Sequence, residues 1–401
     1  MLFEIILSLF LGIIAGVITG LLPGIHTNLI ATTLILFLPL LDFAPTTVLI
    51  VFITSMVITN SFVSFIPAVF LGAPEDDDFL SVLPGHQMLK KGRAHEAVVY
   101  TLYGSLVGLV LILLFTPVFL YGIPFIFNLL RPATAFLLLF LSLYIIFREE
   151  KIMLSLVVFL MAGFLGYASL HLPIDEPLLS LLSGLFGSSA LVLSLKDNVK
   201  IPKQEIISLR NIRLDKTELL KASRSAIVSA PFCSIMPGLG AGHAATIASE
   251  FGRQTQKSFL VLLGAISTVV EGLSFVALYT INKARTGAAV AVGEIVKELS
   301  FTNLMIILST IIFSGSISFF VTLHLSKLFS RGITQISYFK ICLCVLVFMT
   351  IAVFTFSNWI GIVVFISATS LGVFTILSGS RRINLMGCLL MPVIIFYIFS
   401  L

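Results

Sequence analysis

Charged residues are scarce in this sequence of 401 residues: Asp, Glu, Lys and Arg together make up 11% of it, against roughly 25% in a typical soluble domain. Hydrophobic residues account for 58%, and the mean hydropathy is +1.13. A domain folded in water cannot bury so much apolar surface, because too few polar residues are left to cover it. The composition therefore excludes a soluble globular protein.

Cysteine and the familiar catalytic motifs are also sparse. The four cysteines, Cys233, Cys342, Cys344 and Cys388, lie inside apolar runs and lack the spacing of a tetrahedral zinc site, so we expect neither disulfides nor a bound metal. The sequence contains no His-Glu-x-x-His and no Gly-x-Ser-x-Gly motif. We therefore expect a protein that is not an enzyme and has no organic cofactor. The alternative is a membrane hydrolase with an unfamiliar dyad.

Long apolar runs take the place of these features. Six of them are mostly long enough to cross about 30 Å of hydrocarbon and lack internal charge: 98–121, 133–147, 152–170, 301–323, 341–356 and 385–401. Further runs lie near 3–22, 29–41, 46–71, 178–195, 258–281 and 360–377. Together they predict an all-α polytopic protein of the cell membrane with about ten to twelve crossings. The first run follows no basic n-region, so we expect a first transmembrane segment rather than a removable signal peptide.

The basic residues concentrate in one central segment. Between residues 196 and 224 there are eight Lys or Arg and four acids, and the positive-inside rule places such a loop in the cytoplasm. The loop divides the chain into a first repeat with its following helices (1–195), the loop itself (196–224) and a second repeat with the C-terminal helices (225–401). Because the net charge of +5 is carried by loops, it does not indicate a nucleic-acid partner.

A Pro-Gly motif recurs in the two halves, at Pro23-Gly24 and at Pro237-Gly238. In each half an apolar segment precedes the motif, and a long apolar helix, a polar break and another long helix follow it. Many transporters are built from two such repeats. We expect an inverted pair rather than a parallel one, because the acidic, cation-free N-terminus then starts outside.

Each Pro-Gly pair should break a helix at membrane depth, because proline removes a backbone donor and glycine permits unusual dihedrals. Broken or re-entrant helices survive in a membrane only inside protein or beside a wet cavity. The free N–H groups that begin the next half-helix attract anions. The predicted substrate-binding residues are Pro23, Gly24, His26, Thr27, Asn28, Pro237, Gly238, Gly240, Gly242 and His243. The alternative is that the motifs only kink helices for packing and that each histidine bonds neighbouring backbone.

Two further residues are candidates for coupling transport to an ion. Glu271 lies inside an apolar run, where an ionised carboxylate is costly unless it is paired or hydrated. It either carries a proton, helps to hold Na⁺, or forms a structural bridge with Lys283 or Arg285. Asn60 occupies a comparable place in the first half, and it either ligates Na⁺ or bonds a neighbouring helix.

Four sequence motifs resemble those of a known family. They are Gly20-Leu-Leu-Pro-Gly24, the segment 72–93 with its Gly-Ala-Pro-Glu-Asp-Asp-Asp start and its Leu-Pro-Gly-His-Gln and Lys-Gly-Arg, Met236-Pro-Gly-Leu-Gly-Ala-Gly242, and Lys283-Ala-Arg-Thr-Gly-Ala-Ala-Val-Ala291. The chain is similar to the large membrane subunit of tripartite tricarboxylate transporters, the TctA family, in its archaeal form. The resemblance implies a cation-coupled carboxylate importer that works with a small membrane subunit and an extracytoplasmic binding protein. It also implies that the Pro-Gly loops line the substrate site. The four acids after Pro74, and the two histidines His26 and His243, depart from the common pattern.

The expected function is secondary active transport of an organic anion, of the di- or tricarboxylate type, by alternating access coupled to Na⁺ or H⁺. The alternative is a translocase, or flippase, of a lipid-linked phosphate such as a polyprenyl phosphate, which suits the same helix ends. That substrate needs no binding protein. The lipid bilayer is a partner in either case, and a second copy of the chain is among the candidate partners.

Overall fold

The computed structural model describes residues 2–22, 45–72, 82–196, 201–212, 214–236, 239, 241–250 and 255–399. Every regular element in these ranges is a helix, as predicted. The helices of the first half are α1 (Leu2–Leu21), α3 (Thr46–Val63), α4 (Phe65–Leu71), α5 (Val82–Lys90), α6 (Ala94–Leu130), α7 (Thr134–Phe147), α8 (Ile152–His171), α9 (Pro177–Leu182) and α10 (Ser189–Lys196). Those of the second half are α11 (Lys216–Ile235), α12 (Ala241–Glu250), α13 (Gln256–Ile281), α14 (Gly287–Val296), α15 (Phe301–Gly332), α16 (Tyr338–Ser378) and α17 (Gly387–Phe399).

The polytopic membrane class is confirmed. Nine helical segments in the described ranges are long and apolar enough to cross a bilayer. Two of these segments bend, and each contains two apolar arms. The 54-residue segment Ala94–Phe147 bends at the 3₁₀ turn Arg131–Ala133. The 41-residue helix α16 bends at Asn358. With these arms counted separately, the number of crossings lies within the predicted range. Large apolar side chains such as Phe140 and Trp359 are mostly exposed, as lipid-facing residues are.

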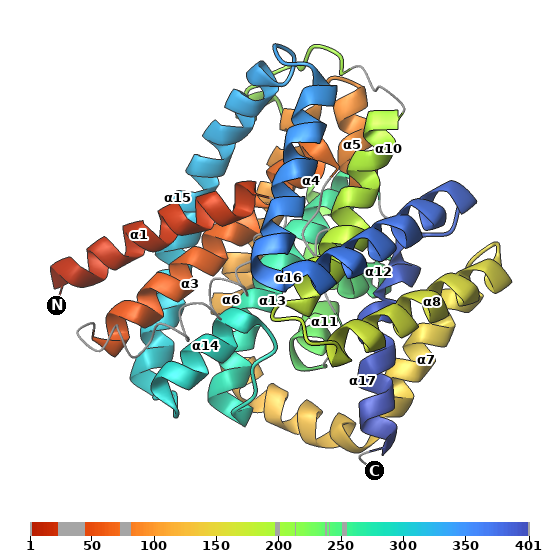
Figure 1. Ribbon diagram of the computed structural model, residues 1–401. Coiled ribbons are helices and arrows are strands. Elements are labelled where there is room, and N and C mark those ends of the chain that lie inside the picture. Colours follow the sequence, from red (N-terminus) through yellow and green to blue (C-terminus); the bar gives the residue numbers. More distant parts are fainter. Residues whose placement is uncertain are drawn as a thin grey trace.

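The two halves present their helices in the same order. Helices α1, α3, α5 and α6 of the first half correspond to α11, α13, α14 and α15 of the second. The three remaining crossings of the first half, namely α7, α8 and the helix formed by α9 and α10, correspond to the two arms of α16 and to α17. In Figure 1 the colours run along the chain, so the helices of the first half are red to yellow-green and those of the second half are green to blue.

Helices that share a position in the two halves cross in opposite directions. Within the first half α1 runs parallel to α3, because Gly12 faces Phe52 and Gly20 faces Val63. Within the second half α11 runs parallel to α13, and the Thr255 hydroxyl at the start of α13 donates to Glu218 at the start of α11.

Contacts between the long helices fix the relative direction of these two pairs. The start of α6 lies beside the end of α15, where His95 bonds Ser326, and α15 runs parallel to α3. Helix α13 runs parallel to α6, since Gly104 meets Val261. Hence α1 and α3 end on the face where α11 and α13 begin, as the predicted inverted repeat requires.

The halves interlock through two parallel helix pairs, α6 on α13 and α15 on α3. In the first pair the backbones are in direct contact. A Cβ added to Gly104 would lie 1.9 Å from the Val261 carbonyl oxygen, and one added to Gly264 would lie 2.0 Å from the carbonyl oxygen of Thr101. Small residues allow this approach between membrane helices. Each half therefore packs its long helix against the other half.

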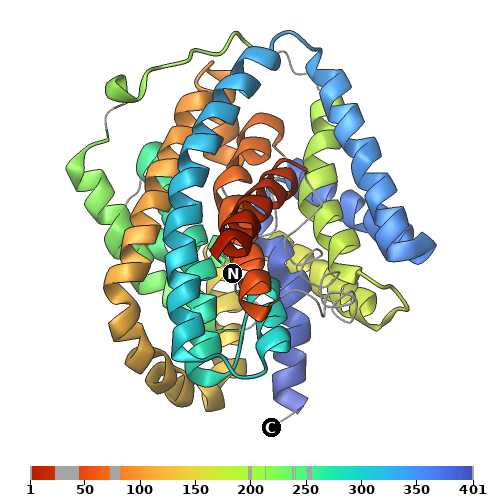
Figure 2. The ribbon, with the colours of Figure 1, turned by 90° about the vertical axis from the view of Figure 1, so that its left-hand side faces the viewer.

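Basic residues gather on one face of the molecule, at the top of Figure 1, where α5, α10, α15 and α16 come together. The described cations there lie near helix ends, in the central loop and in the first half of α11: Lys90, Lys91, Arg93, Lys196, Lys203, Arg210, Lys216, Lys221, Arg224, Lys257, Lys327, Arg331 and Lys340. Figure 2 shows the central loop running along the same face. The positive-inside rule predicts that this basic face lies in the cytoplasm, which would put the Leu2 end of α1 on the outer face. This orientation stays a prediction.

Helix α16 bends at Asn358, which has a left-handed conformation (φ 57°, ψ −169°). Its side-chain oxygen accepts hydrogen bonds from the N–H groups of Ile360 (2.9 Å) and Gly361 (3.4 Å), and so caps the second arm. Its amide nitrogen donates to the carbonyl of Pro173 at 3.1 Å. The bend is therefore fixed by the residue that occupies it.

Replacing Asn358 with alanine should lower the free energy of unfolding by about 1–2 kcal/mol, because alanine lacks the cap and resists a positive φ. Glycine at the same position tolerates the conformation and should cost only a few tenths of a kcal/mol as a cap, roughly. Thermal unfolding of the purified protein compares the two variants. Equal losses for alanine and glycine would show that backbone conformation contributes nothing at the bend.

Candidate functional site

The second Pro-Gly motif falls at a break between two helices. Helix α11 ends at Ile235, Met236 is extended (φ −83°, ψ 125°), and α12 begins at Ala241. Gly242 and His243, in the first turn of α12, are buried. The predicted interruption of a helix inside the protein is therefore present in the second half.

Most residues of the predicted substrate site lie outside the described residues. This applies to Pro23, Gly24, His26, Thr27 and Asn28 in the first half. It also applies to Pro237, Gly238 and Gly240 in the second half. Their place at the site stays a prediction.

Glu271 differs in burial from its neighbours along the middle of α13. Every other residue between positions 260 and 278 is buried, and Glu271 alone is partly exposed. A carboxylate in an apolar helix retains its charge only where water or a counter-charge reaches it. Helix α13 also packs against α12, the helix that follows the second break.

Ser274, one turn after Glu271, fixes the loop that leads into α14. Its hydroxyl oxygen accepts hydrogen bonds from the N–H groups of Arg285 (3.2 Å) and Thr286 (3.1 Å), and from the Thr286 hydroxyl (3.1 Å). Arg285 is half-buried and close enough to His243 to act on it electrostatically. A carboxylate on α13, a histidine on α12 and a guanidinium before α14 thus belong to one region of the second half.

The other cation of this loop points elsewhere. The Lys283 ammonium lies over the ring of Phe127 on α6, 4.9 Å from its centre. Lys283 is exposed, whereas Arg285 is half-buried. From the sequence, Lys283 and Arg285 were both candidate partners of Glu271. In the structure they differ in burial, and Lys283 contacts Phe127.

Asn60 lies in a buried polar contact among three helices. Its amide donates to the Thr19 hydroxyl of α1 at 3.2 Å, and the neighbouring Thr59 hydroxyl accepts a hydrogen bond from Ser318 of α15 at 2.8 Å. The bond to Thr19 is the interhelical contact that the sequence analysis gave as one of two alternatives. A role as an ion ligand stays a prediction.

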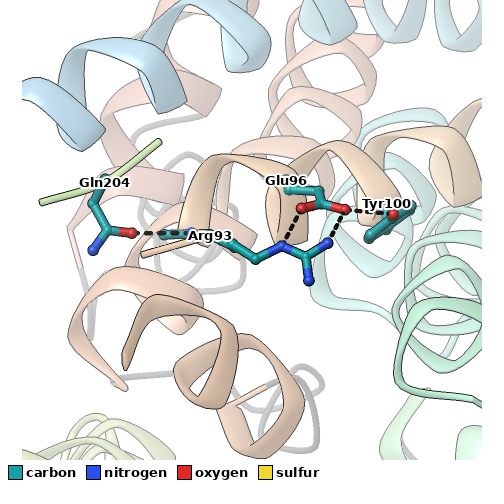
Figure 3. Close-up of polar contacts among 5 residues, drawn as sticks. Arg93, Glu96, Tyr100 and Gln204 are labelled. Atoms are coloured by element: carbon teal, nitrogen blue, oxygen red, sulfur yellow. Dashed lines mark hydrogen bonds and ion pairs between the residues drawn. The ribbon is translucent and has the colours of Figure 1, made fainter. Parts of the chain in front are cut away.

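A third polar cluster lies at the basic face, where α6 begins (Figure 3). Arg93 forms a two-point ion pair with Glu96, with both distances 2.6 Å, and Glu96 also accepts a hydrogen bond from Tyr100 at 2.7 Å. The hydrogen bonds to Glu96 raise the pKa of the Arg93 guanidinium above its ordinary value. The Lys257 ammonium at the start of α13 lies 5.5 Å from the centre of the Tyr100 ring.

This cluster also holds the central loop. The Gln204 side chain accepts a hydrogen bond from the Ala94 N–H at 3.0 Å (Figure 3). It also donates to the Leu89 carbonyl at 3.1 Å. The Glu205 N–H donates to the Gly92 carbonyl at 2.7 Å. The basic loop is therefore fastened to the start of α6.

The sequence analysis missed Ser274, Thr19 and the polar contacts of α15. Each depends on a partner in another helix, which local patterning does not reveal. One signal was available: α15 carries a hydroxyl residue at every fourth position from Ser314 to Ser330. That spacing places them on one side of a helix.

Two inverted halves, an interrupted helix and a carboxylate in the otherwise buried middle of α13 are the features of a secondary carrier. The chain belongs to the tripartite tricarboxylate transporter TctA family, whose model matches residues 6–387. An uncharacterized protein of Methanocaldococcus jannaschii is 30% identical over 407 residues, which cover 98% of this chain and 99% of that protein. No solved structure matches the chain. The resemblance stated from the four sequence motifs is confirmed, and the protein is a multi-pass transporter subunit of the plasma membrane.

Proposed function

We propose that this protein imports an organic anion with two or three carboxylates by alternating access, coupled to the entry of Na⁺ or H⁺. The observation that carries the proposal is the partly exposed Glu271 in the otherwise buried middle of α13, next to a helix break in a family of tricarboxylate transporters. A carboxylate at such a place in a membrane helix is a candidate for binding a proton or Na⁺.

The anion needs positive partners in the same region. The N–H groups at the start of α12 carry partial positive charge, because no preceding turn accepts from them. Arg285 adds a full charge and a planar pair of donors that suits a carboxylate. His243 supplies a further ring nitrogen. The substrate would therefore bind between α12 and the loop before α14.

Coupling follows from the signs of the charges. An anionic substrate and the Glu271 carboxylate repel each other in a medium of low dielectric constant. A proton or Na⁺ at Glu271 removes that repulsion, so cation and substrate bind together more tightly than either binds alone. Two inverted halves then exchange inward-open and outward-open forms around the loaded site.

The tripartite family name indicates further subunits. We extend the proposal to a small membrane subunit and an extracytoplasmic binding protein that delivers the substrate to the outer face. A second copy of the chain is a further candidate partner. None of these changes the chemistry of the site within this chain.

A thermal-shift experiment on the purified protein tests the proposal. Citrate and succinate, with and without Na⁺ and at two pH values, should raise the unfolding temperature. At 100 times its Kd a ligand adds about 2.7 kcal/mol of stability. Undecaprenyl phosphate should have no effect. A shift with the lipid phosphate and none with any carboxylate would instead support the flippase alternative.

The loop before α14 offers a matched pair of variants. Arg285→Met should abolish the citrate shift, because it removes the guanidinium from the proposed site. Lys283→Met removes an equal charge two residues away, where the side chain faces Phe127. It should leave the shift unchanged. Equal effects of the two variants would show that citrate responds to net charge only.

A further inference from the structure

Helix α15 carries a row of buried hydroxyls that the proposed substrate site does not use. The row consists of Ser314, Ser318, Thr322, Ser326 and Ser330, all at most 2% exposed, and is called the hydroxyl stripe below. It faces α3 at Thr59 and α6 at His95. The stripe thus extends from the contact beside Asn60 toward the basic face.

The outer half of the stripe has a structural explanation. The Ser314 hydroxyl donates to the Thr310 carbonyl at 2.6 Å, and the Ser318 hydroxyl donates to the Ser314 carbonyl at 2.6 Å. Such bonds to the preceding turn are the usual way in which serine is accommodated in a membrane helix. These two residues therefore need no ligand.

The inner half of the stripe, Thr322, Ser326 and Ser330, lacks such bonds to the preceding turn among the contacts of the described residues. Thr322 and Ser330 are buried, and within the described part of the chain their hydroxyl oxygens have no hydrogen-bond partner. Ser326 bonds Nδ1 of His95, and Nε2 of that fully buried ring also has no partner among the described residues. Buried polar atoms of this kind are normally satisfied by protein or by water. Thr322 and Ser330 on α15, and the His95 ring that bonds Ser326 between them, are therefore groups that bound water would satisfy.

We propose that the inner half of the hydroxyl stripe, together with His95, conducts the coupling proton between the middle of the protein and the cytoplasm. The inference rests on the proposed cation-coupled function and specifies its ion. Hydroxyls and bound water pass a proton along hydrogen bonds. A neutral imidazole accepts a proton at one ring nitrogen and releases the proton held at the other, so the ring is neutral again after each transfer, as the other tautomer.

The surroundings of the stripe favour a proton over Na⁺. Two charged groups act on the His95 ring, Lys327 on α15 and Glu96 on α6, and Glu96 is already paired with Arg93. A metal cation would meet the Lys327 ammonium without a free carboxylate to offset it. A proton carries the same charge, but it needs only one oxygen or nitrogen atom at a time, whereas Na⁺ needs several oxygen ligands around it at once. The hydroxyls of the stripe are about one helical turn apart and so suit the proton.

Proteoliposomes that contain the pH dye pyranine test the path, with citrate added outside in a Na⁺-free buffer and citrate uptake measured in parallel. The wild type should acidify the lumen as citrate enters. His95→Gln and Thr322→Val should each reduce acidification at least tenfold. Ser309→Ala is the matched control, because Ser309 lies on the same helix but is exposed and bonds only the Met305 carbonyl. It should behave as the wild type.

Citrate uptake without acidification, or normal acidification by both variants, would overturn the inference and leave the proposed function intact. Absence of citrate uptake by the wild type counts against the proposed function instead. In that case NMR of ¹⁵N-labelled histidine decides, with the His95 signal identified from the His95→Gln spectrum. Exchange of its ring N–H with water should slow at least tenfold in Thr322→Val and not in Ser309→Ala. Equal exchange rates would refute the path without any substrate.

Discussion

Replacing Glu271 with glutamine is expected to abolish coupled transport while leaving the fold intact. Glutamine keeps the size of the side chain, but it carries no charge and has only one accepting oxygen, so it can neither take up a proton nor balance a cation. Loss of a hydrogen bond to a charged group costs about 1.5–3 kcal/mol, which corresponds to a fall in transport of roughly 10- to 100-fold. Citrate uptake into proteoliposomes, driven by a Na⁺ or a proton gradient, measures the effect.

Glu294→Gln is the control for this prediction. Glu294 lies on α14, not far along the chain from Arg285, but its side chain is exposed. The variant loses the same charge and should transport as the wild type does. The unfolding temperature of Glu271→Gln should stay close to that of the wild type, because glutamine has nearly the same size and shape as glutamate. Full, ion-dependent uptake by Glu271→Gln would refute the assigned role.

The fold class could be read from the sequence because membrane helices carry a strong local signal. Each crossing is a long apolar run, and lipid leaves the backbone no alternative to a helix. The inverted relation of the halves was also accessible, through the recurrence of Pro23-Gly24 at Pro237-Gly238 and the basic loop between them. The break between Ile235 and Ala241 follows from the same motif.

The polar contacts were less accessible, because they join residues far apart in the sequence. Gln204 bonds the N–H of Ala94 across 110 positions, and Ser318 bonds Thr59 across 259. Nothing in the local sequence around Gln204 distinguishes it from a solvated loop residue. The different surroundings of Lys283 and Arg285 likewise depend on Phe127 and Ser274, which other helices supply.

Local hydropathy could not predict how the apolar runs join into helices. Hydropathy detects apolar length, but it does not reveal that α16 is one helix with a capped bend at Asn358. It also does not reveal that the helix Pro177–Lys196 contains a π-helical turn at Ser183–Ser188, where Arg382 donates to the carbonyl of Phe186. Both features depend on a side chain that satisfies freed backbone groups.

Gly104→Ala is expected to be the most destabilising small substitution in the described part of the chain. The added methyl carbon would meet the Val261 carbonyl oxygen at 1.9 Å and the Ala265 nitrogen at 2.9 Å. Both are backbone atoms of α13, so no side chain can rotate away and the two helices must separate. Overpacking of this kind costs about 3 kcal/mol or more. Because α6 and α13 come from different halves, the separation loosens the contact that joins them.

Gly122→Ala provides the comparison within the same helix. A Cβ added at Gly122 has no neighbour within 4 Å, so the substitution adds the same methyl group in open space. Alanine also favours the helix over glycine by about 1 kcal/mol in water, and the variant should unfold at or slightly above the wild-type temperature. Unfolding curves in detergent, read by intrinsic fluorescence or by circular dichroism, compare the two variants. If Gly104→Ala and Gly122→Ala unfold together, α6 and α13 do not meet backbone to backbone in the folded protein.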